Sequence, residues 1–146
     1  MHHVNRIALA LVLTLSVVSA ACRAGQPADT TSSTTAVVKV SDVTLGRAIG
    51  GDKAVTDKTD NFKPNDTIYA SITTDGTAAS SSLRARWTYS DGQVVDDSTR
   101  AIAPNGRAVT EFHIAKPDGW PLGNYQVEVF LDGKSVETKK FEVKGS

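Results

Sequence analysis

The sequence predicts an all-β domain, an antiparallel two-sheet sandwich of about seven short strands, preceded by a targeting segment and a disordered tether. Three observations predict this architecture. From Val37 onward, apolar and polar residues alternate with a period of two, as in half-buried strands. Turn-forming pairs such as Asp91-Gly92 and Asp132-Gly133 separate these runs. The length of 146 residues permits one domain of ordinary size.

The first 21 residues have the order of a secretory signal peptide. His2, His3 and Arg6 precede an apolar run from Ile7 to Val18, and small residues follow. The apolar run is about a dozen residues long, whereas a helix needs roughly 20 to span a bilayer. We therefore expect this segment to be removed on export.

The apolar run closes on Ser19-Ala20-Ala21-Cys22, which resembles the lipobox of bacterial lipoproteins, although Ser19 stands where that motif usually has Leu or another large aliphatic. The resemblance implies that Cys22 is lipidated and becomes the first mature residue. Cys22 is also the single cysteine of the chain, so it has no intramolecular disulfide partner. We expect a membrane anchor at Cys22. The alternative is ordinary signal peptidase cleavage, which leaves a soluble secreted protein with an exposed thiol.

The residues after the cysteine predict a destination and a tether. Arg23 carries no acidic retention signal, and by resemblance to Gram-negative lipoproteins this implies the outer membrane, facing the periplasm, rather than the inner membrane. Residues 22–36 contain a Ser/Thr run from Thr30 to Thr35 and no large apolar residue. Such a segment cannot bury enough surface to offset its ordering entropy. The domain is expected to occupy residues 37–146.

The alternating pattern predicts the strands one by one, and no helix of ordinary length has a pattern to support it. In the third strand, Leu83, Ala85 and Trp87 share one face. Changes of parity predict bulges near Ser41-Asp42 and near Lys139-Lys140. The strands are expected at 37–45, 67–73, 82–89, 93–97, 108–114, 124–131 and 134–144.

Two sequence features resemble immunoglobulin-like domains. The segment 122–127, LGNYQV, resembles the tyrosine corner of immunoglobulin-like and fibronectin type III domains. The segments 120–143 and 62–69 are similar to phrases of bacterial lipoproteins with such a domain. The resemblance implies export and a sandwich, and it implies no reaction. We expect Trp87 and Tyr125 to be buried, with the Tyr125 hydroxyl bonded near the corner at 117–122.

The chain offers little material for catalysis. His113 is the single histidine after the signal segment, so a His-based metal cage is excluded, and neither zinc-ligand spacing nor a nucleophile elbow is present. Glu111 lies two residues before His113 on the same strand face, where a surface ion pair is favoured over general base chemistry. We therefore expect no enzyme activity, no cofactor and no metal.

An acidic loop leaves one question about calcium open. Its four aspartates could supply oxygen ligands, but their spacing fits no calcium-loop template, and nearby lysines neutralise much of their charge. Calcium is therefore disfavoured. The aspartates are Asp52, Asp57, Asp60 and Asp66, and the lysines are Lys53, Lys58 and Lys63.

Charge and exposed side chains define the expected partners. Sixteen basic and 16 acidic side chains cancel, which argues against a nucleic-acid partner. Arg84 and Arg86 are expected on an outer sheet face, where Glu128 could pair with one of them; Tyr69 and Phe130 also have outward parity. Trp120 is expected to plug one end of the sandwich, with a ligand platform as the alternative. The weak candidate binding residues are Arg84, Arg86, Tyr69, Phe130 and Trp120.

We expect a non-enzymatic lipoprotein of the bacterial cell envelope that binds another envelope protein or supports an assembly. Loops at one end, or an open strand edge, are the binding surfaces that this architecture offers. The alternatives are an inhibitor or accessory module of an exported enzyme, and a carbohydrate-binding domain.

Overall fold

The computed structural model describes residues 37–145, and the predicted signal peptide, the predicted lipidation site at Cys22 and the predicted tether lie outside them. The described residues form eight strands and no helix. Accordingly, they contain no helix of the length and apolarity that a membrane span requires. The strands are β1 (Lys39–Gly46), β2 (Asn61–Phe62), β3 (Ile68–Asp75), β4 (Ser81–Tyr89), β5 (Val94–Ile102), β6 (Ala108–Ile114), β7 (Gly123–Leu131) and β8 (Lys134–Val143).

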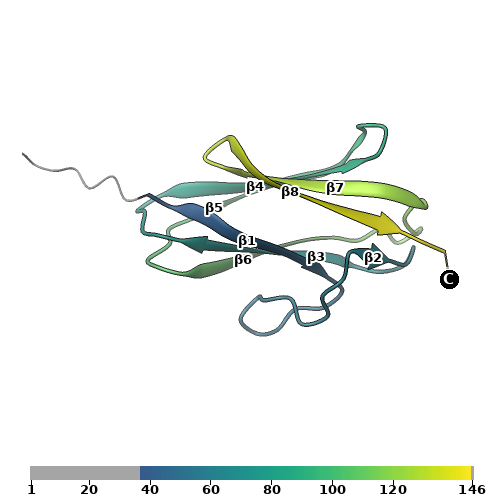
Figure 1. The fold of residues 1–146 in the computed structure, drawn as a ribbon, viewed down its shortest axis with the longest axis horizontal. Helices are drawn as coiled ribbons and strands as arrows, with labels where there is room; N and C mark the ends of the chain where they lie inside the picture. Colours follow the sequence, from purple (N-terminus) through teal and green to yellow (C-terminus); the bar gives the residue numbers. More distant parts are fainter. Residues whose placement is uncertain (1–36, 146) are drawn as a thin grey trace, which may run out of the picture. The chain divides into compact units, whose positions relative to one another are not determined.

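The strands form two sheets that stack face to face (Figure 1). One sheet has three strands in the order β1-β3-β6, and the other has five in the order β2-β8-β7-β4-β5. All pairings are antiparallel except that of β2 with β8. The predicted antiparallel two-sheet sandwich is confirmed.

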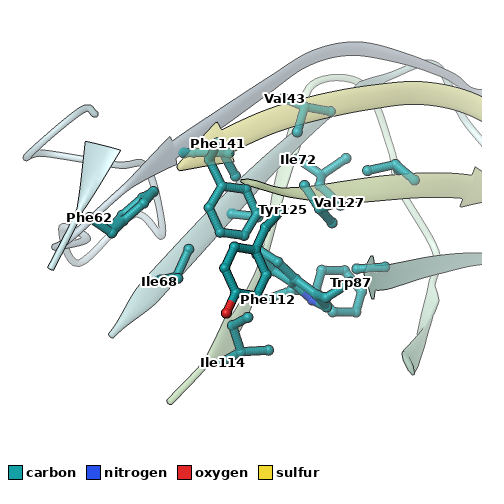
Figure 2. Packing of buried hydrophobic residues seen from close by; sticks show 14 of the residues in the cluster. Val43, Phe62, Ile68, Ile72, Trp87, Phe112, Ile114, Tyr125, Val127 and Phe141 are labelled. Atoms are coloured by element: carbon teal, nitrogen blue, oxygen red, sulfur yellow. The ribbon is translucent and has the colours of Figure 1, made fainter. Parts of the chain in front are cut away.

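The inner faces of both sheets supply the core (Figure 2). Leu83, Ala85 and Trp87 of β4 are completely buried, as their shared parity predicts. Ile68 and Ile72 of β3 are also completely buried on the opposite sheet. Interleaving of these two sets removes apolar surface from water, which is the main driving force for forming the sandwich.

The tyrosine corner is present at the start of β7. The Tyr125 hydroxyl donates a hydrogen bond to the Pro121 carbonyl at 2.7 Å, and Tyr125 is buried. Burial raises the pKa of the Tyr125 hydroxyl, because the ionised form would lose solvation. Both expectations for this residue, burial and a bond to the 117–122 corner, are confirmed.

One of the two predicted bulges is confirmed and the other is wrong in position. The pairing of β1 with β3 shifts between Val40 and Asp42, as predicted. In the β7–β8 hairpin, Val129 pairs with Glu137 and Phe130 pairs with Ser135. The extra residue is therefore Val136, whereas Lys139 and Lys140 pair regularly.

The position was wrong because the sequence pattern treats every valine as an inward marker. Val136 is 40% exposed and contributes nothing to the core. The inward parity of β8 does change between Val136 and Phe141. If Val136 faced inward, however, the bulge would have to follow it, near Lys139-Lys140. Once Val136 is the bulged residue, the rest of β8 keeps one register.

Two features of the five-stranded sheet were not predicted. The two-residue β2 is too short for any periodicity, and the sequence analysis assigned only seven strands. Strand β5 continues to Ile102, five residues beyond its predicted end at 97. Its later residues are mostly exposed and polar, so they show no alternating pattern that would predict a strand. Their pairing with β4 gives them the extended conformation.

Candidate functional site

A cleft of about 690 Å³ opens where the edge of one sheet faces the edge of the other. Strand β5 is the last strand of the five-stranded sheet, and β6 is the last strand of the three-stranded sheet. The cleft is bounded by the start of β5, the end of β6 and the corner that follows β6. Residues lining it include Tyr89, Val94, Asp96, His113, Lys116 and Pro121.

Trp120 contributes a fixed part of the cleft wall. Its side chain is buried, and its indole Nε1 donates to the Asp66 carbonyl at 3.0 Å. Its backbone N–H donates to the Pro64 carbonyl at 2.7 Å. Trp120 therefore plugs this end of the sandwich, as the sequence analysis expected, and only part of its surface reaches the cleft.

Tyr89 forms the opposite aromatic wall and ties β4 to the corner. Its hydroxyl donates to the Leu122 carbonyl at 2.9 Å, and its ring lies edge-on to Tyr125 with 4.8 Å between ring centroids. Gly123, with φ of +140°, makes this close approach possible, because a Cβ there would lie 2.7 Å from the Tyr89 hydroxyl oxygen. The aromatic walls of the cleft are thus held by hydrogen bonds and packing.

The cleft carries more acidic than basic side chains. Asp91 and Asp96 lie on the β4–β5 side, and Lys116 lies at the end of β6. Asp91 accepts the Gln93 backbone N–H at 2.8 Å, and Asp96 accepts the Ser98 hydroxyl at 2.6 Å. Each carboxylate keeps further acceptor capacity, so the β5 side can receive a basic group.

His113 and Glu111 lie together at the outer side of the β6 edge. The imidazole Nδ1 contacts a Glu111 carboxylate oxygen, and the two side chains are 50% and 15% exposed, respectively. Tyr69 of β3 is directly opposite His113 in the pairing, and the two ring centroids are 5.4 Å apart. The predicted Glu111–His113 contact is present, and it becomes an ion pair when His113 is protonated.

Three of the weak candidate binding residues lie side by side on the outer face of the five-stranded sheet. Arg84 pairs in register with Phe130, and its guanidinium lies 5.1 Å from the ring centroid. Arg86 follows on the same face of β4. Tyr69 and Trp120 are elsewhere, so the five candidates do not form one surface.

The arginines pair with Asp97 of β5 and not with Glu128, which corrects the sequence-based expectation. Arg84 contacts both Asp97 carboxylate oxygens, and Arg86 Nε lies 3.2 Å from one of them. The reason is the register of β5 on β4, which places Asp97 directly opposite Arg86. Glu128 instead accepts a hydrogen bond from the Ser135 hydroxyl.

The arginine pair predicts a small loss of stability in acid. Hydrogen bonds from Arg84 hold the pKa of Asp97 at about 2, against desolvation and with help from Arg86. Because the folded-state pKa lies below the unfolded value near 4, the stabilisation is complete above about pH 4 and disappears as the pH falls through 2. These partly exposed pairs should contribute about 0.2 to 1 kcal/mol. Urea unfolding of wild type and Asp97→Asn should differ by this amount at pH 6, and the difference should shrink as the pH falls toward 2. A difference at pH 2 as large as that at pH 6 would contradict the assignment.

The acidic loop does not gather its carboxylates around one point. Asp57 pairs with Arg47, Asp52 accepts the Ala54 backbone N–H, and Asp66 accepts the Lys63 backbone N–H. Arg47 lowers the pKa of the Asp57 carboxyl by hydrogen bonding. Within residues 37–145, no three His, Cys, Asp or Glu side chains are grouped as metal ligands would be. Each carboxylate serves the local loop structure.

Comparison with solved structures identifies the architecture. An immunoglobulin-like protein from Pseudomonas aeruginosa superimposes with a TM-score of 0.53 at 15% sequence identity, over 76% of this chain and 99% of that chain. The fold is immunoglobulin-like. No protein-family model matches the sequence, and a search of curated proteins also finds no match.

Other structural similarities are weaker. A β-glucosidase from Listeria innocua matches with a TM-score of 0.48 at 9% identity, over 75% of this chain but 16% of that chain. A CARDB domain from Pyrococcus furiosus matches with a TM-score of 0.41 at 17% identity, over 72% of this chain and 88% of that chain. At these levels the similarity carries no argument about activity.

The cleft itself was missed by sequence reasoning. Its lining comes from the β4–β5 turn, the start of β5, the end of β6 and the following corner, which are far apart in the chain. The available signal was Val94, a large apolar residue that is 48% exposed. Its exposure depends on β5 being a sheet edge, and a single sequence does not reveal strand order.

Proposed function

We propose that this protein is a non-enzymatic lipoprotein of the bacterial cell envelope, anchored through Cys22, whose immunoglobulin-like domain binds another envelope protein at the cleft between β5 and β6. The observation that carries this proposal is the position of the cleft. It lies at the end of the sandwich opposite the point where the chain enters. The immunoglobulin-like fold is compatible with a binding or structural module.

The distance between these two ends can be estimated along strand β3. Lys39, near the start of the domain, pairs with Asp75 at the last position of β3. His113, at the cleft, pairs with Tyr69 near the first position of β3. The six-residue step along β3 from Tyr69 to Asp75 corresponds to roughly 20 Å of strand at about 3.3 Å per residue. Figure 1 shows the start of β1 and the end of β8 at opposite ends of the domain.

This polarity suits a domain held by an N-terminal anchor. A tether that joins at Val37 would leave the cleft end accessible to a partner in the periplasm. The sequence supports the anchor through the lipobox-like segment and Cys22, and it supports the outer membrane through Arg23. Stable anchoring would require more than one acyl chain, because a single chain holds only marginally.

Site-specific photo-cross-linking in cells tests both parts of the proposal. A photoreactive residue at position 94, beside the cleft, should cross-link an envelope protein, whereas the same residue at position 136 should not. Val94 and Val136 are matched controls, since they are 48% and 40% exposed and lie on different hairpins. Cys22→Ser should abolish lipid labelling and reduce the cross-link. Equal cross-linking from both positions would contradict the cleft, and unacylated wild-type protein in the periplasm would contradict the anchor.

The identity of the cross-linked protein separates the binding alternatives. A structural envelope protein would indicate a scaffold, and an exported protease or hydrolase would indicate an inhibitor or accessory module. Carbohydrate binding is disfavoured because Trp120, the aromatic platform considered for it, is 6% exposed and donates its indole N–H to backbone.

The non-enzymatic proposal has its own test at His113. We expect wild-type protein to show no hydrolytic turnover and His113→Ala to remain folded, because this side chain is half exposed on an edge strand. The measurement pairs thermal unfolding with assays on ester, peptide and glycoside substrates. Turnover by wild type that is lost in a folded His113→Ala protein would overturn the proposal.

A further inference from the structure

The four outer strands of the two sheets differ in how they prevent pairing with another chain. Sheet edges present unpaired backbone groups, and proteins usually protect them with charges, bulges or very short strands. Strand β1 has a bulge after Val40, and β2 has only two residues. Strand β5 has Val95 as an extra residue opposite β4 and carries Asp96, Asp97 and Arg100. Three edges are therefore protected.

Strand β6 has neither a bulge nor a very short length, and it carries fewer charges than β5. Its seven residues, AVTEFHI, pair with β3 one to one without a register shift. They include no proline and no lysine, and Glu111 is their single acidic residue. Most are β-branched or aromatic, which suits an extended ladder. Strand β6 is thus a regular, weakly protected edge, and its end lines the cleft.

The core beside β6 is covered by a side chain from the other sheet. The Arg100 guanidinium of β5 lies 5.3 Å from the centroid of the Phe112 ring of β6. Arg100 belongs to an exposed part of β5 and reaches across between the two edges. A long basic side chain therefore lies where a further strand of the three-stranded sheet would pack.

We propose that the partner supplies an extended peptide segment that pairs with the free edge of β6 as a fourth strand of that sheet. This inference rests on the proposed function, since it specifies how the cleft is occupied. Backbone hydrogen bonds to β6 would provide affinity, and alternate side chains would enter the cleft. The segment would present apolar side chains on the side of Phe112 and Ile114, and polar side chains on the side of Glu111 and His113.

The charges beside β6 favour a basic segment. Glu111 faces the position of a polar side chain on the added strand, and opposite charges on neighbouring strands attract. Asp91 and Asp96 line the other wall of the cleft beside Lys116. Arg100 lies over Phe112, so apolar residues and not cations suit the inward positions of the segment. Lysine or arginine at the outward positions of the segment would therefore complement this edge, and glutamate or aspartate would be repelled.

A second copy of this chain fits the edge less well. Glu111 lies at the centre of β6, so antiparallel pairing of two β6 strands would bring two Glu111 carboxylates close together. Like charges on directly opposed residues destabilise such a pair. An isolated segment of another protein avoids this repulsion.

The test uses three capped synthetic peptides of seven residues, the length of β6, and the purified full chain. The first peptide alternates valine and lysine, the second alternates valine and glutamate, and the third is the valine–lysine peptide with N-methylated backbone amides. Amide hydrogen exchange and binding affinity are measured for each. The valine–lysine peptide should slow exchange in β6, and the other two should bind about tenfold more weakly or not at all.

Two lysine substitutions, one on each edge strand, provide the protein variants. Thr110→Lys places a charge on the inward, partly buried face of β6, and Thr99→Lys places one on the exposed outer face of β5. Thr110→Lys should weaken binding of the valine–lysine peptide about tenfold, and Thr99→Lys should leave it unchanged. Thermal unfolding checks both folds; the N-methylated peptide tests the same point if Thr110→Lys unfolds.

Four results would overturn strand addition: no binding of the valine–lysine peptide, equal binding of its N-methylated form, protection of β5 instead of β6, or a wild-type dimer that Thr110→Lys dissociates. The last would identify a second copy as the occupant. If position 94 cross-links an envelope protein and any of these results is found, the proposed function stands and only strand addition to β6 is rejected. If position 94 gives no cross-link but the valine–lysine peptide binds, the envelope partner is rejected instead.

Discussion

Replacing Trp87 with alanine is expected to lower the free energy of unfolding by about 3 to 5 kcal/mol, a large part of the roughly 5 to 15 kcal/mol typical of a domain. Trp87 is completely buried, and its ring packs edge-on to Phe141 with 5.8 Å between centroids. Figure 2 shows it among side chains from both sheets, so truncation would leave a cavity between them. Urea unfolding measures the loss as a lower midpoint. A midpoint equal to that of wild type would show that this strand face is not the core.

Two conservative substitutions serve as controls for this cavity. Trp87 Nε1 is buried and has no hydrogen-bond partner among the described residues. Trp87→Phe removes that unpaired N–H while keeping an aromatic ring, so its cost should be well below that of Trp87→Ala. Tyr125→Phe removes the hydrogen bond to Pro121 and should cost about 1 kcal/mol.

Phe62→Ala is expected to have an effect of similar size, about 3 to 5 kcal/mol. Phe62 is 1% exposed and packs edge-on to Phe141 at 5.5 Å between centroids. Its strand β2 is also tied to the end of β8, because the Lys144 N–H donates to the Phe62 carbonyl at 2.9 Å and the Glu142 N–H donates to the Asp60 carbonyl at 2.8 Å. The variant should therefore lower the urea midpoint and also speed amide exchange of Lys144 and Glu142.

Phe130→Ala is the matched control for Phe62→Ala. Phe130 is partly exposed on the outer face of the five-stranded sheet, where it contacts Arg84. Its truncation should cost much less and leave exchange at Lys144 unchanged. If Phe130→Ala proved as destabilising as Phe62→Ala, burial would not be what makes Phe62 important.

Together these variants separate the core from the proposed binding edge. Trp87 and Phe62 stabilise the contact between the sheets, whereas Thr110 and Glu111 lie on a strand whose outer edge has no neighbour among residues 37–145. A variant that unfolds the domain would abolish partner binding for a trivial reason. Edge variants that keep the wild-type midpoint are therefore the informative ones for function.

The sequence by itself determined the fold class and most strand positions. Alternation with a period of two is a local property of the chain, so it located β6 at 108–114 and the inward face of β4 without further information. The Asp132-Gly133 turn was also readable, since both residues adopt positive φ, which favours these two types. The LGNYQV segment marked Tyr125 and its hydrogen bond through its resemblance to the tyrosine corner of immunoglobulin-like domains.

Tertiary structure alone decided the features that depend on strand neighbours. Phe62 becomes core because a two-residue strand pairs with β8, and Asp97 becomes the partner of two arginines because the register of β5 on β4 places it opposite Arg86. The position of the second bulge at Val136 was likewise set by register with β7. The cleft exists because β5 and β6 are the open edges of different sheets at the same end. Pairing energy comes from residues far apart in the chain, so period and composition predict strands but neither their order nor the surfaces that their edges create.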